Sequence, residues 1–185
     1  MTVARKAWLD ALAATLDARA LVVAGLGANA RYLPHLPIKA AHFAMCDAMG
    51  AAIPLALGMA LAKPERQVIA LEGDGSLLMN LGTLATVGAT AVRNLTILLF
   101  DNRHYESSGG QDLPKVEVDL VAIARAARIP TAERLASAAA LPAALARSDG
   151  PAFYLLPTVF DPDEPIPPYS ERPDEIRLNF ARRLA

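Results

Sequence analysis

Two short apolar runs that end in polar residues constrain the fold of this chain more than any other feature. The first covers residues 68–71 and leads into Glu72-Gly73-Asp74-Gly75-Ser76, and the second covers residues 95–100 and leads into Asp101-Asn102. Between them, residues 77–88 repeat apolar side chains at helical spacing. Runs of this length are typical of parallel strands that are buried on both faces. The stretch therefore predicts a strand, a helix and a second strand of one sheet.

The same alternation continues on both sides of this stretch. Further strands are predicted at residues 20–24, 41–45, 129–135 and 152–156, the third of them a short edge strand. Further helices are predicted at residues 4–17, 51–62, 119–127 and 138–147. Strands that alternate with helices imply a parallel sheet with helices on both faces. The predicted fold is therefore α/β, doubly wound, with a mostly parallel sheet.

Polar residues at the ends of the first two runs predict a binding site. Ligands of open α/β sheets bind beyond the carboxyl ends of the strands, so Asp74 and Asn102 are expected at one edge of the sheet. The glycines on either side of Asp74 allow main-chain N–H groups to approach an anion. Carboxylate and amide oxygens are ligands that Mg²⁺ prefers. These residues predict a site for a phosphate group bridged by a hard cation.

Composition excludes several classes of function. Hydrophobic residues make up 54% of the chain and charged residues 20%, which predicts a globular protein with a packed core. A net charge of −1 without a basic stripe argues against nucleic acid as a partner. The apolar stretches are too short to span a bilayer, and the N-terminus lacks the apolar core of a signal peptide. Cys46 is the single cysteine, which fits a reducing compartment, and the cytoplasm is the predicted location.

The phosphate-and-metal motif resembles that of a known enzyme family. Gly73-Asp74-Gly75-Ser76, followed after the helical stretch by a pair that ends in Asn102, is similar to the motif of thiamine-diphosphate enzymes. The resemblance implies the thiamine-diphosphate-binding fold, with thiamine diphosphate and Mg²⁺ as cofactors. It implies that the side chains of Asp74 and Asn102 and the main-chain carbonyl of His104 ligate the metal.

Other segments match positions at which this family binds the cofactor. Gly27-Ala28-Asn29 corresponds to the turn that binds the far phosphate, and Gly75 and Ser76 to donors for the diphosphate. Met49, before a glycine, matches the apolar residue that holds the cofactor bent, and the main chain of Asp47 and Met49 would meet the aminopyrimidine. The full cofactor-binding set that we expect is Gly27, Ala28, Asn29, Asp47, Met49, Gly73, Gly75, Ser76, Asn102 and Tyr105.

Within the family, residues 45–111 resemble the β subunit of sulfopyruvate decarboxylase and the matching half of phosphonopyruvate decarboxylase. This resemblance implies a lyase that decarboxylates a small anionic 2-oxo acid. Residues 1–160 would form the diphosphate- and Mg²⁺-binding domain, and residues 161–185 a Pro-rich tail or docking arm. A separate α subunit would supply the pyrimidine-binding domain and its catalytic Glu. Asp101 departs from the usual Asn, and the differing loop at residues 103–106 leaves the substrate open.

Several alternatives stay open on the sequence. His104 and Tyr105 are either side-chain catalysts or plain loop residues, because an imidazole suits proton transfer near neutral pH. Arg31 and Arg103 either pair with the anionic end of a substrate or are surface charges. The chain could instead be half of a thiamine-diphosphate carboligase or of a 2-oxo-acid oxidoreductase, although the oxidoreductases often carry more cysteines than Cys46. The non-enzyme alternative is a degenerate scaffold subunit.

Overall fold

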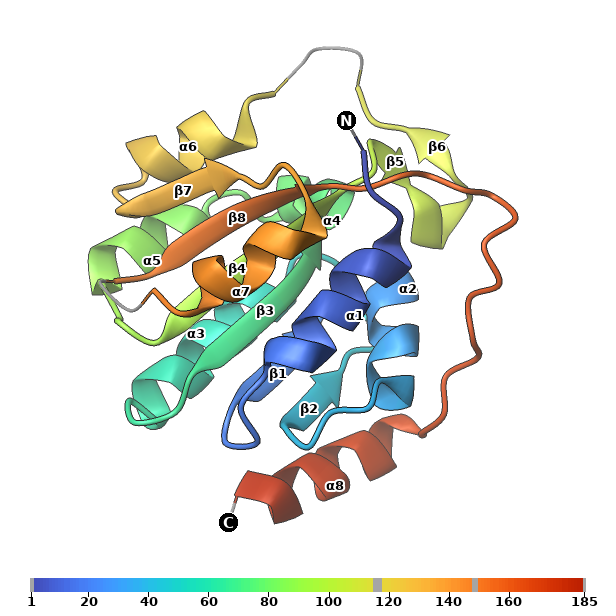
Figure 1. The fold of residues 1–185 in the computed structure, drawn as a ribbon, viewed down its shortest axis with the longest axis horizontal. Helices are drawn as coiled ribbons and strands as arrows, with labels where there is room; N and C mark the ends of the chain where they lie inside the picture. The colour runs from blue at the N-terminus through green and yellow to red at the C-terminus, as the bar shows by residue number, and fades with distance from the viewer. Residues whose placement is uncertain (1, 115–117, 148–149, 185) are drawn as a thin grey trace.

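The computed structural model describes residues 2–114, 118–147 and 150–184, and its centre is a six-stranded parallel sheet. The strand order is β2-β1-β3-β4-β8-β7, and each neighbouring pair is parallel (Figure 1). The strands are β1 (Leu21–Ala24), β2 (Ala41–Ala44), β3 (Val68–Gly73), β4 (Leu95–Asp101), β7 (Thr131–Arg134) and β8 (Ala152–Pro157). All six predicted strands are present, and β7 is an edge strand as predicted.

Helices cover both faces of the sheet, which confirms the doubly wound α/β prediction. One face carries α1 (Arg5–Thr15), α2 (Ala28–Tyr32) and α7 (Leu141–Leu145), which lie in front of the sheet in Figure 1. The other face carries α3 (Ala52–Ala62), α4 (Asp74–Met79), α5 (Thr83–Thr90) and α6 (Leu120–Ala126). Short 3-10 turns at Leu33–His35 and Ala138–Ala140 precede β2 and α7.

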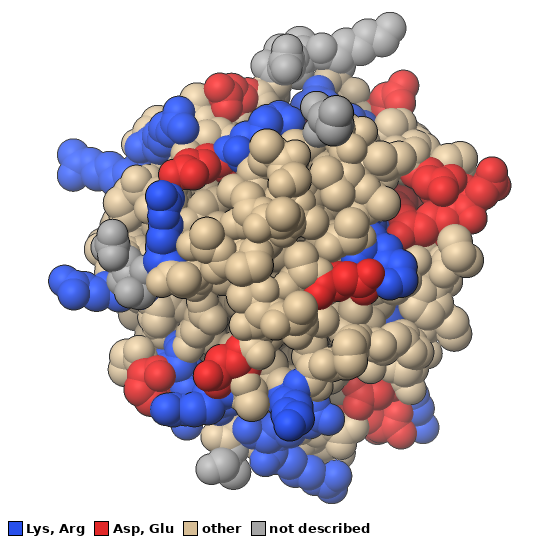
Figure 2. Space-filling model, viewed as in Figure 1, with Lys and Arg blue, Asp and Glu red and all other residues tan. Residues whose placement is uncertain are grey.

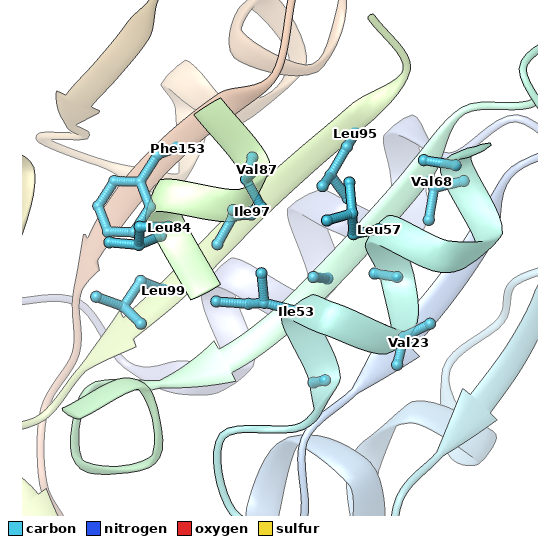
Figure 3. Packing of buried hydrophobic residues seen from close by; sticks show 14 of the residues in the cluster. Val23, Ile53, Leu57, Val68, Leu84, Val87, Leu95, Ile97, Leu99 and Phe153 are labelled. Carbon is cyan, nitrogen blue, oxygen red and sulfur yellow. The ribbon is translucent and has the colours of Figure 1, made fainter. Parts of the chain in front are cut away.

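The continuous apolar runs are explained by burial on two sides. In β3, Val68 and Ala70 belong to the cluster under α3 and α5, whereas Ile69 and Leu71 belong to the cluster under α1 and α7. A strand of this kind has no solvent face, so no polar residue alternates along it. Figure 3 shows the first cluster, in which side chains of α3 and α5 point onto β3, β4 and β8; labelled there are Val23, Ile53, Leu57, Val68, Leu84, Val87, Leu95, Ile97, Leu99 and Phe153.

The strand order reverses between β1 and β3. From β1 the chain passes outward to β2 and then returns to the opposite side of β1 as β3. α2, which follows β1, lies on one face and α4, which follows β3, lies on the other, so the loops after β1 and β3 diverge. Ligands of open α/β sheets bind at such a switch point, beyond the carboxyl ends of the strands. The predicted phosphate and metal residues lie at this place.

The single helix predicted at residues 77–88 is wrong. α4 ends at Met79, and α5 begins at Thr83 after a turn at Asn80–Gly82. Asn80 leaves the helical conformation, and its side-chain amide donates a hydrogen bond of 2.9 Å to the carbonyl of Gly50. A tertiary contact therefore ends the helix where the apolar spacing alone would continue it.

Two other segments also differ from the prediction. The helix predicted at residues 138–147 is shorter, because a 3-10 turn at Ala138–Ala140 precedes α7, which has a proline in its first turn. The loop after Asn102 contains a small hairpin of β5 (His104–Tyr105) and β6 (Gln111–Asp112), joined by a 3-10 turn, η2 (Glu106–Ser108). We refer to residues 104–112 as the hairpin.

The tail is a docked arm that ends in a helix. Residues 161–169 run beside α2, and α8 (Pro173–Leu184) covers β2, the other edge strand (Figure 1). The Phe180 ring meets Phe43 of β2 edge-on, with 5.5 Å between ring centroids. The structure describes this tail as far as residue 184, while Ala185 lies outside the described residues. The domain boundary at residue 160 stays a prediction.

On the face drawn in Figure 2, Lys and Arg alternate with Asp and Glu around a largely uncharged middle. No helix in the described part of the chain is both long and apolar enough to cross a membrane.

Candidate functional site

The predicted site residues surround one small cavity at the switch point. The cavity has a volume of about 50 Å³. Its lining comprises Arg5, Leu26, Gly27, Ala28, Asn29, Met49, Gly73, Asp74, Gly75, Ser76, Phe100, Asn102, His104, Tyr105, Glu106 and Ser107. Every predicted metal and cofactor residue except Asp47 is in this set. Asp47 is exposed in the loop after β2, where its carboxylate accepts a hydrogen bond from the N–H of Ala48 at 2.6 Å.

Asp74 is the buried acid of the site. It begins α4 directly after β3 and is 1% exposed. Its two carboxylate oxygens accept hydrogen bonds from the N–H groups of Gly75 at 2.8 Å and Arg103 at 2.6 Å. Burial raises the pKa of Asp74 to about 7; the two N–H groups oppose this shift, and the nearby carboxyl of Asp101 adds to it. A positive charge beside Asp74 would therefore stabilise the ionised form of this carboxyl in the folded protein.

Asn102 lies across the cavity from the first motif, at the end of β4. Its side-chain oxygen accepts a hydrogen bond from the N–H of His104 at 3.0 Å, and its amide nitrogen donates to Glu106 Oε2 at 2.9 Å. Arg103 has a φ of 64°, a left-handed conformation that is uncommon outside glycine. This turn aims the N–H of Arg103 at Asp74, so the segment after β4 is tied to the segment after β3.

The Met49-Gly50 segment is fixed against α4. The N–H of Gly50 donates to the Ser76 hydroxyl at 2.7 Å, and the carbonyl of Gly50 accepts from Asn80. Gly50 has a φ of 78°, and a Cβ at this position would lie 2.7 Å from the Cβ of Asn80. Only glycine fits there without a backbone shift. The turn places Met49 in the cavity wall together with Ser76.

Glu72 is a buried acid that sequence reasoning did not assign. It is 1% exposed at the end of β3, and its Oε1 accepts a hydrogen bond from the N–H of Gly73 at 3.1 Å. Burial raises the pKa of Glu72, although Ser76 and the main-chain N–H groups of Gly73 and Ala52 oppose the shift. A Cβ on Gly25 would lie 2.5 Å from Glu72 Oε1. This carboxyl therefore packs under the turn after β1 and beside Ser76.

The hairpin lies directly over both glycine-rich turns. A Cβ on Gly75 would lie 2.6 Å from the Tyr105 ring, and a Cβ on Gly27 would lie 3.1 Å from the Cβ of Ser107. Both glycines therefore form a cradle that side chains of the hairpin now fill. The donors fit a diphosphate and a hard cation, provided that the hairpin moves.

His104 is held by contacts on three sides. Its ring stacks on Phe160 with 3.8 Å between ring centroids. Its Nδ1 lies 2.7 Å from the carbonyl of Asn102, and its Nε2 lies 3.0 Å from a carboxylate oxygen of Asp112. Both ring nitrogens are thus engaged in the closed hairpin. The side chain lines the cavity, and both of its ring nitrogens already have partners there.

Arg5 is the main site residue that sequence reasoning missed. It is 4% exposed and reaches from the first turn of α1 into the cavity wall. Its guanidinium contacts Asn29 Oδ1 at 3.1 Å, Glu164 Oε2 at 3.2 Å, and Glu106 Oε2. In the sequence, Arg5 looks like the polar side of an amphipathic helix, so no signal marks it.

The two arginines proposed for an anionic substrate do not line this cavity. Arg31 donates to the main-chain carbonyls of Ile166, at 3.1 Å, and Pro167, so it fastens the tail to α2. Arg103 lines a separate hollow of about 730 Å³ between β4, β7 and α6. The tail reaches the site instead through Tyr169, whose hydroxyl accepts a hydrogen bond from the N–H of Gly27 at 3.1 Å.

Comparisons with known proteins identify sequences that are similar to this chain. The chain is 47% identical over 122 residues to a phosphonopyruvate decarboxylase of Streptomyces viridochromogenes, a match that covers 66% of this chain and 30% of that protein. It is 44% identical over 104 residues to sulfopyruvate decarboxylase subunit beta of Methanothermobacter thermautotrophicus, covering 56% of each chain. The chain thus spans about a third to just over half the length of these relatives.

A solved structure shares the fold. A thiamine diphosphate-dependent 4-hydroxybenzoylformate decarboxylase of Rhodococcus jostii RHA1 superposes with a TM-score of 0.74 over 88% of this chain and 34% of that one, at 21% identity. Residues 26–154 match the family model described as thiamine pyrophosphate enzyme, C-terminal TPP binding domain. This region contains both glycine-rich turns, Asp74 and Asn102, so the chain belongs to the thiamine pyrophosphate enzymes and carries their C-terminal TPP-binding domain.

Proposed function

We propose that this chain is the diphosphate- and Mg²⁺-binding subunit of a thiamine-diphosphate-dependent decarboxylase, a lyase. The observation that supports it best is the common cavity. Asp74 and Asn102, from two neighbouring strands, line it together with the two glycine-rich turns and Met49. One carboxylate, one amide oxygen and a cradle of main-chain N–H groups suit a diphosphate bridged by Mg²⁺.

Each of these residues has a distinct role in the proposal. Asp74, Asn102 and the main-chain carbonyl of His104 hold the metal. The turns at residues 27–29 and 73–76 hold the diphosphate, and Met49 supports the cofactor. When bound, thiamine diphosphate supplies the electron sink that a 2-oxo acid needs to lose CO₂.

The substrate proposal is a small 2-oxo acid with an anionic far end. It rests on the two relatives named above, a phosphonopyruvate decarboxylase and a sulfopyruvate decarboxylase subunit beta. Tyr105 is the stronger of the two predicted catalytic side chains, because its ring lies on Gly75, whereas both ring nitrogens of His104 have partners.

A separate chain completes the enzyme in this proposal. The relative from Methanothermobacter is named as a subunit. This chain covers 56% of its length, compared with 30% of the phosphonopyruvate decarboxylase. The second chain would carry the pyrimidine-binding domain and the Glu that activates the cofactor. A gene next to this one that encodes such a domain is the first partner to try.

Reconstitution tests the proposal. This chain and the partner are mixed with Mg²⁺, thiamine diphosphate and either sulfopyruvate or phosphonopyruvate, and CO₂ release is measured. We expect activity only in the complete mixture, and its loss on Asp74→Ala. A mixture that fails to bind thiamine diphosphate would refute the proposal. Reduction of an electron acceptor in place of simple CO₂ release would identify an oxidoreductase half, and full activity of Asp74→Ala would identify a scaffold subunit.

A further inference from the structure

A partly buried cluster of charges joins three distant parts of the chain beside the cofactor site. Arg5 of α1 contacts Glu106 of the hairpin and Glu164 of the tail, which are separated from it by 101 and 159 residues. The third partner of the guanidinium is Asn29, in the turn predicted to bind the far phosphate. Arg5, Asn29 and Glu106 all line the cavity. The cluster is therefore part of the site's wall.

The charges of this cluster are not balanced. One guanidinium faces two carboxylates, and Glu106 Oε1 is buried without a hydrogen-bond partner among the described residues. A buried carboxylate oxygen that lacks a hydrogen-bond donor is unfavourable, because its lost hydration is not replaced. Glu106 is thus held by Arg5 and Asn102 through Oε2 alone, while its other oxygen is left unsatisfied by the described residues. Such an arrangement suits a carboxylate that gives way to a better anion.

The backbone next to Arg5, in contrast, is fixed by contacts with the end of β8. Val3 forms a parallel bridge with Thr158, and its N–H donates to the carbonyl of Pro157 at 2.9 Å. The Trp8 indole donates to the same carbonyl at 3.3 Å, and Trp8 is fully buried. The start of α1 is therefore anchored to the end of β8. A cation in the first turn does not stabilise a helix, because the helix dipole is positive there, so helix stability gives no reason for Arg5.

The hairpin that carries Glu106 also covers the two glycine turns. Tyr105 lies on Gly75, and Ser107 lies on Gly27. A diphosphate that enters these turns displaces both side chains, and Glu106 stands between them in the chain. The same movement removes a negative charge from the site and leaves the Arg5 guanidinium facing the cavity.

We infer that Arg5 is a ligand of the cofactor's diphosphate, and that Glu106 occupies the place of this anion in the empty protein. The guanidinium exchanges a carboxylate for phosphate oxygens, which match its fork of N–H donors equally well. This inference rests on the proposed function. It goes beyond the family match, because Arg5 and Glu164 lie outside the matched residues 26–154.

The competing interpretation is that Arg5 only clamps the hairpin and tail to α1. The two interpretations predict different effects of a substitution at Glu106 on the affinity for the anion. If Glu106 competes with the diphosphate, the neutral isostere Glu106→Gln strengthens anion binding. If the cluster is only a clamp, or if Glu106 helps to hold the cation, Glu106→Gln leaves binding unchanged or weakens it.

The test is calorimetric titration of the full chain with inorganic diphosphate in the presence of Mg²⁺. We expect Glu106→Gln to bind about tenfold more tightly, and Arg5→Gln about tenfold more weakly, since a nearby buried charge contributes on this scale. In the double variant the gain from Glu106→Gln should vanish, because the two groups act on each other. Lys6→Gln is the matched control: it removes the neighbouring exposed cation, which pairs with Asp10, and should leave binding unchanged.

The outcomes separate this inference from the proposed function. Unchanged or weaker binding by Glu106→Gln overturns the inference, as does unchanged binding by an Arg5→Gln protein whose circular dichroism and unfolding temperature match the wild type. If Arg5→Gln does not fold, the sign of the Glu106→Gln effect decides alone. A wild-type chain that binds neither inorganic diphosphate nor thiamine diphosphate overturns the proposed function together with the inference.

Discussion

At the scale of single residues, Asp74 shows how a binding site lowers the stability of the protein that carries it. Its carboxyl has a pKa raised from 3.8 to about 7, mainly by burial. A raised pKa in the folded state means that stability is fully present below the unfolded value and is lost as the pH rises through the folded value. The window of loss therefore runs from about pH 4 to about pH 7.

Asp74→Asn should remove this loss. The free energy of unfolding of the variant should exceed that of the wild type by an amount that grows as the pH rises. The difference should grow by roughly 1.4 kcal/mol per pH unit within the window, up to a few kcal/mol in total. Urea unfolding of the cofactor-free chain at pH 5, 6, 7 and 8 measures the difference. Asp10→Asn, at an exposed surface pair, is the control and should show no such trend. A pH-independent difference for Asp74→Asn would show that this carboxyl does not titrate in the window.

The motif residues could be predicted because each follows a recognisable strand. Gly75, Asp74 and Asn102 were expected at one edge of the sheet, and all three line one cavity. Arg5 and Glu164 could not be predicted, because their pairing depends on where the two ends of the chain meet. The main-chain role of Asp47 came from the family resemblance alone, and Asp47 does not line the cavity. Sequence spacing thus locates residues within one βαβ unit and not contacts between distant segments.

At the scale of elements, two of the glycines in the helices that cover the sheet, Gly58 and Gly88, have opposite surroundings. A Cβ on Gly58 of α3 would meet no other atom within 4 Å, whereas a Cβ on Gly88 of α5 would overlap the carbonyl oxygen of Ala127. Gly58→Ala should therefore stabilise the protein by about 0.5–1 kcal/mol, since alanine loses less backbone entropy in a helix. Gly88→Ala should destabilise it by about 2 kcal/mol or more, because backbone atoms must shift.

Chemical unfolding of the two variants checks this pair. Each glycine serves as the control for the other, because the substitution and the type of element are the same. Equal effects of the two substitutions would contradict the expected close approach of α5 to the segment after α6.

The start of α6 supports a separate prediction. The Asp119 side chain accepts a hydrogen bond from the N–H of Ala122 at 2.9 Å and so caps the helix. Asp119→Ala should cost about 1 kcal/mol of stability, and Asp119→Asn should cost little, because asparagine caps about as well. Thermal unfolding of both variants measures the difference, and a similar loss in both would point to the charge instead of the cap.

Helices and strands could be predicted where the spacing of apolar residues alone indicates them. The six strands and α1, α3 and α6 have a continuous apolar pattern, and each is close to its expected position. The break at Asn80 and the hairpin were missed for a physical reason. The conformation of Asn80 depends on a hydrogen bond to the distant Gly50, which no local pattern indicates. The strands β5 and β6 have two residues each and are too short to show an alternation of side chains.

At the scale of the whole molecule, the tail closes one edge of the sheet. β2 is an edge strand, and an uncovered edge invites pairing with other chains. α8 lies against β2 through Ile176 and Phe180, which are 3% and 5% exposed. Leu178, between them in the chain, is 43% exposed and points away from this contact. The same helix therefore offers a buried and an exposed apolar residue for comparison.

Phe180→Ala should cost about 3 kcal/mol, because it removes a buried ring and its edge-on contact with Phe43. Leu178→Ala should change the free energy of unfolding by less than about 0.5 kcal/mol. Once α8 is loosened, β2 has an open edge, so Phe180→Ala should also associate as its concentration rises, which size-exclusion chromatography with light scattering detects. If Phe180→Ala were as stable as Leu178→Ala and equally monodisperse, α8 would not be docked in solution, and the edge of β2 would need another cover.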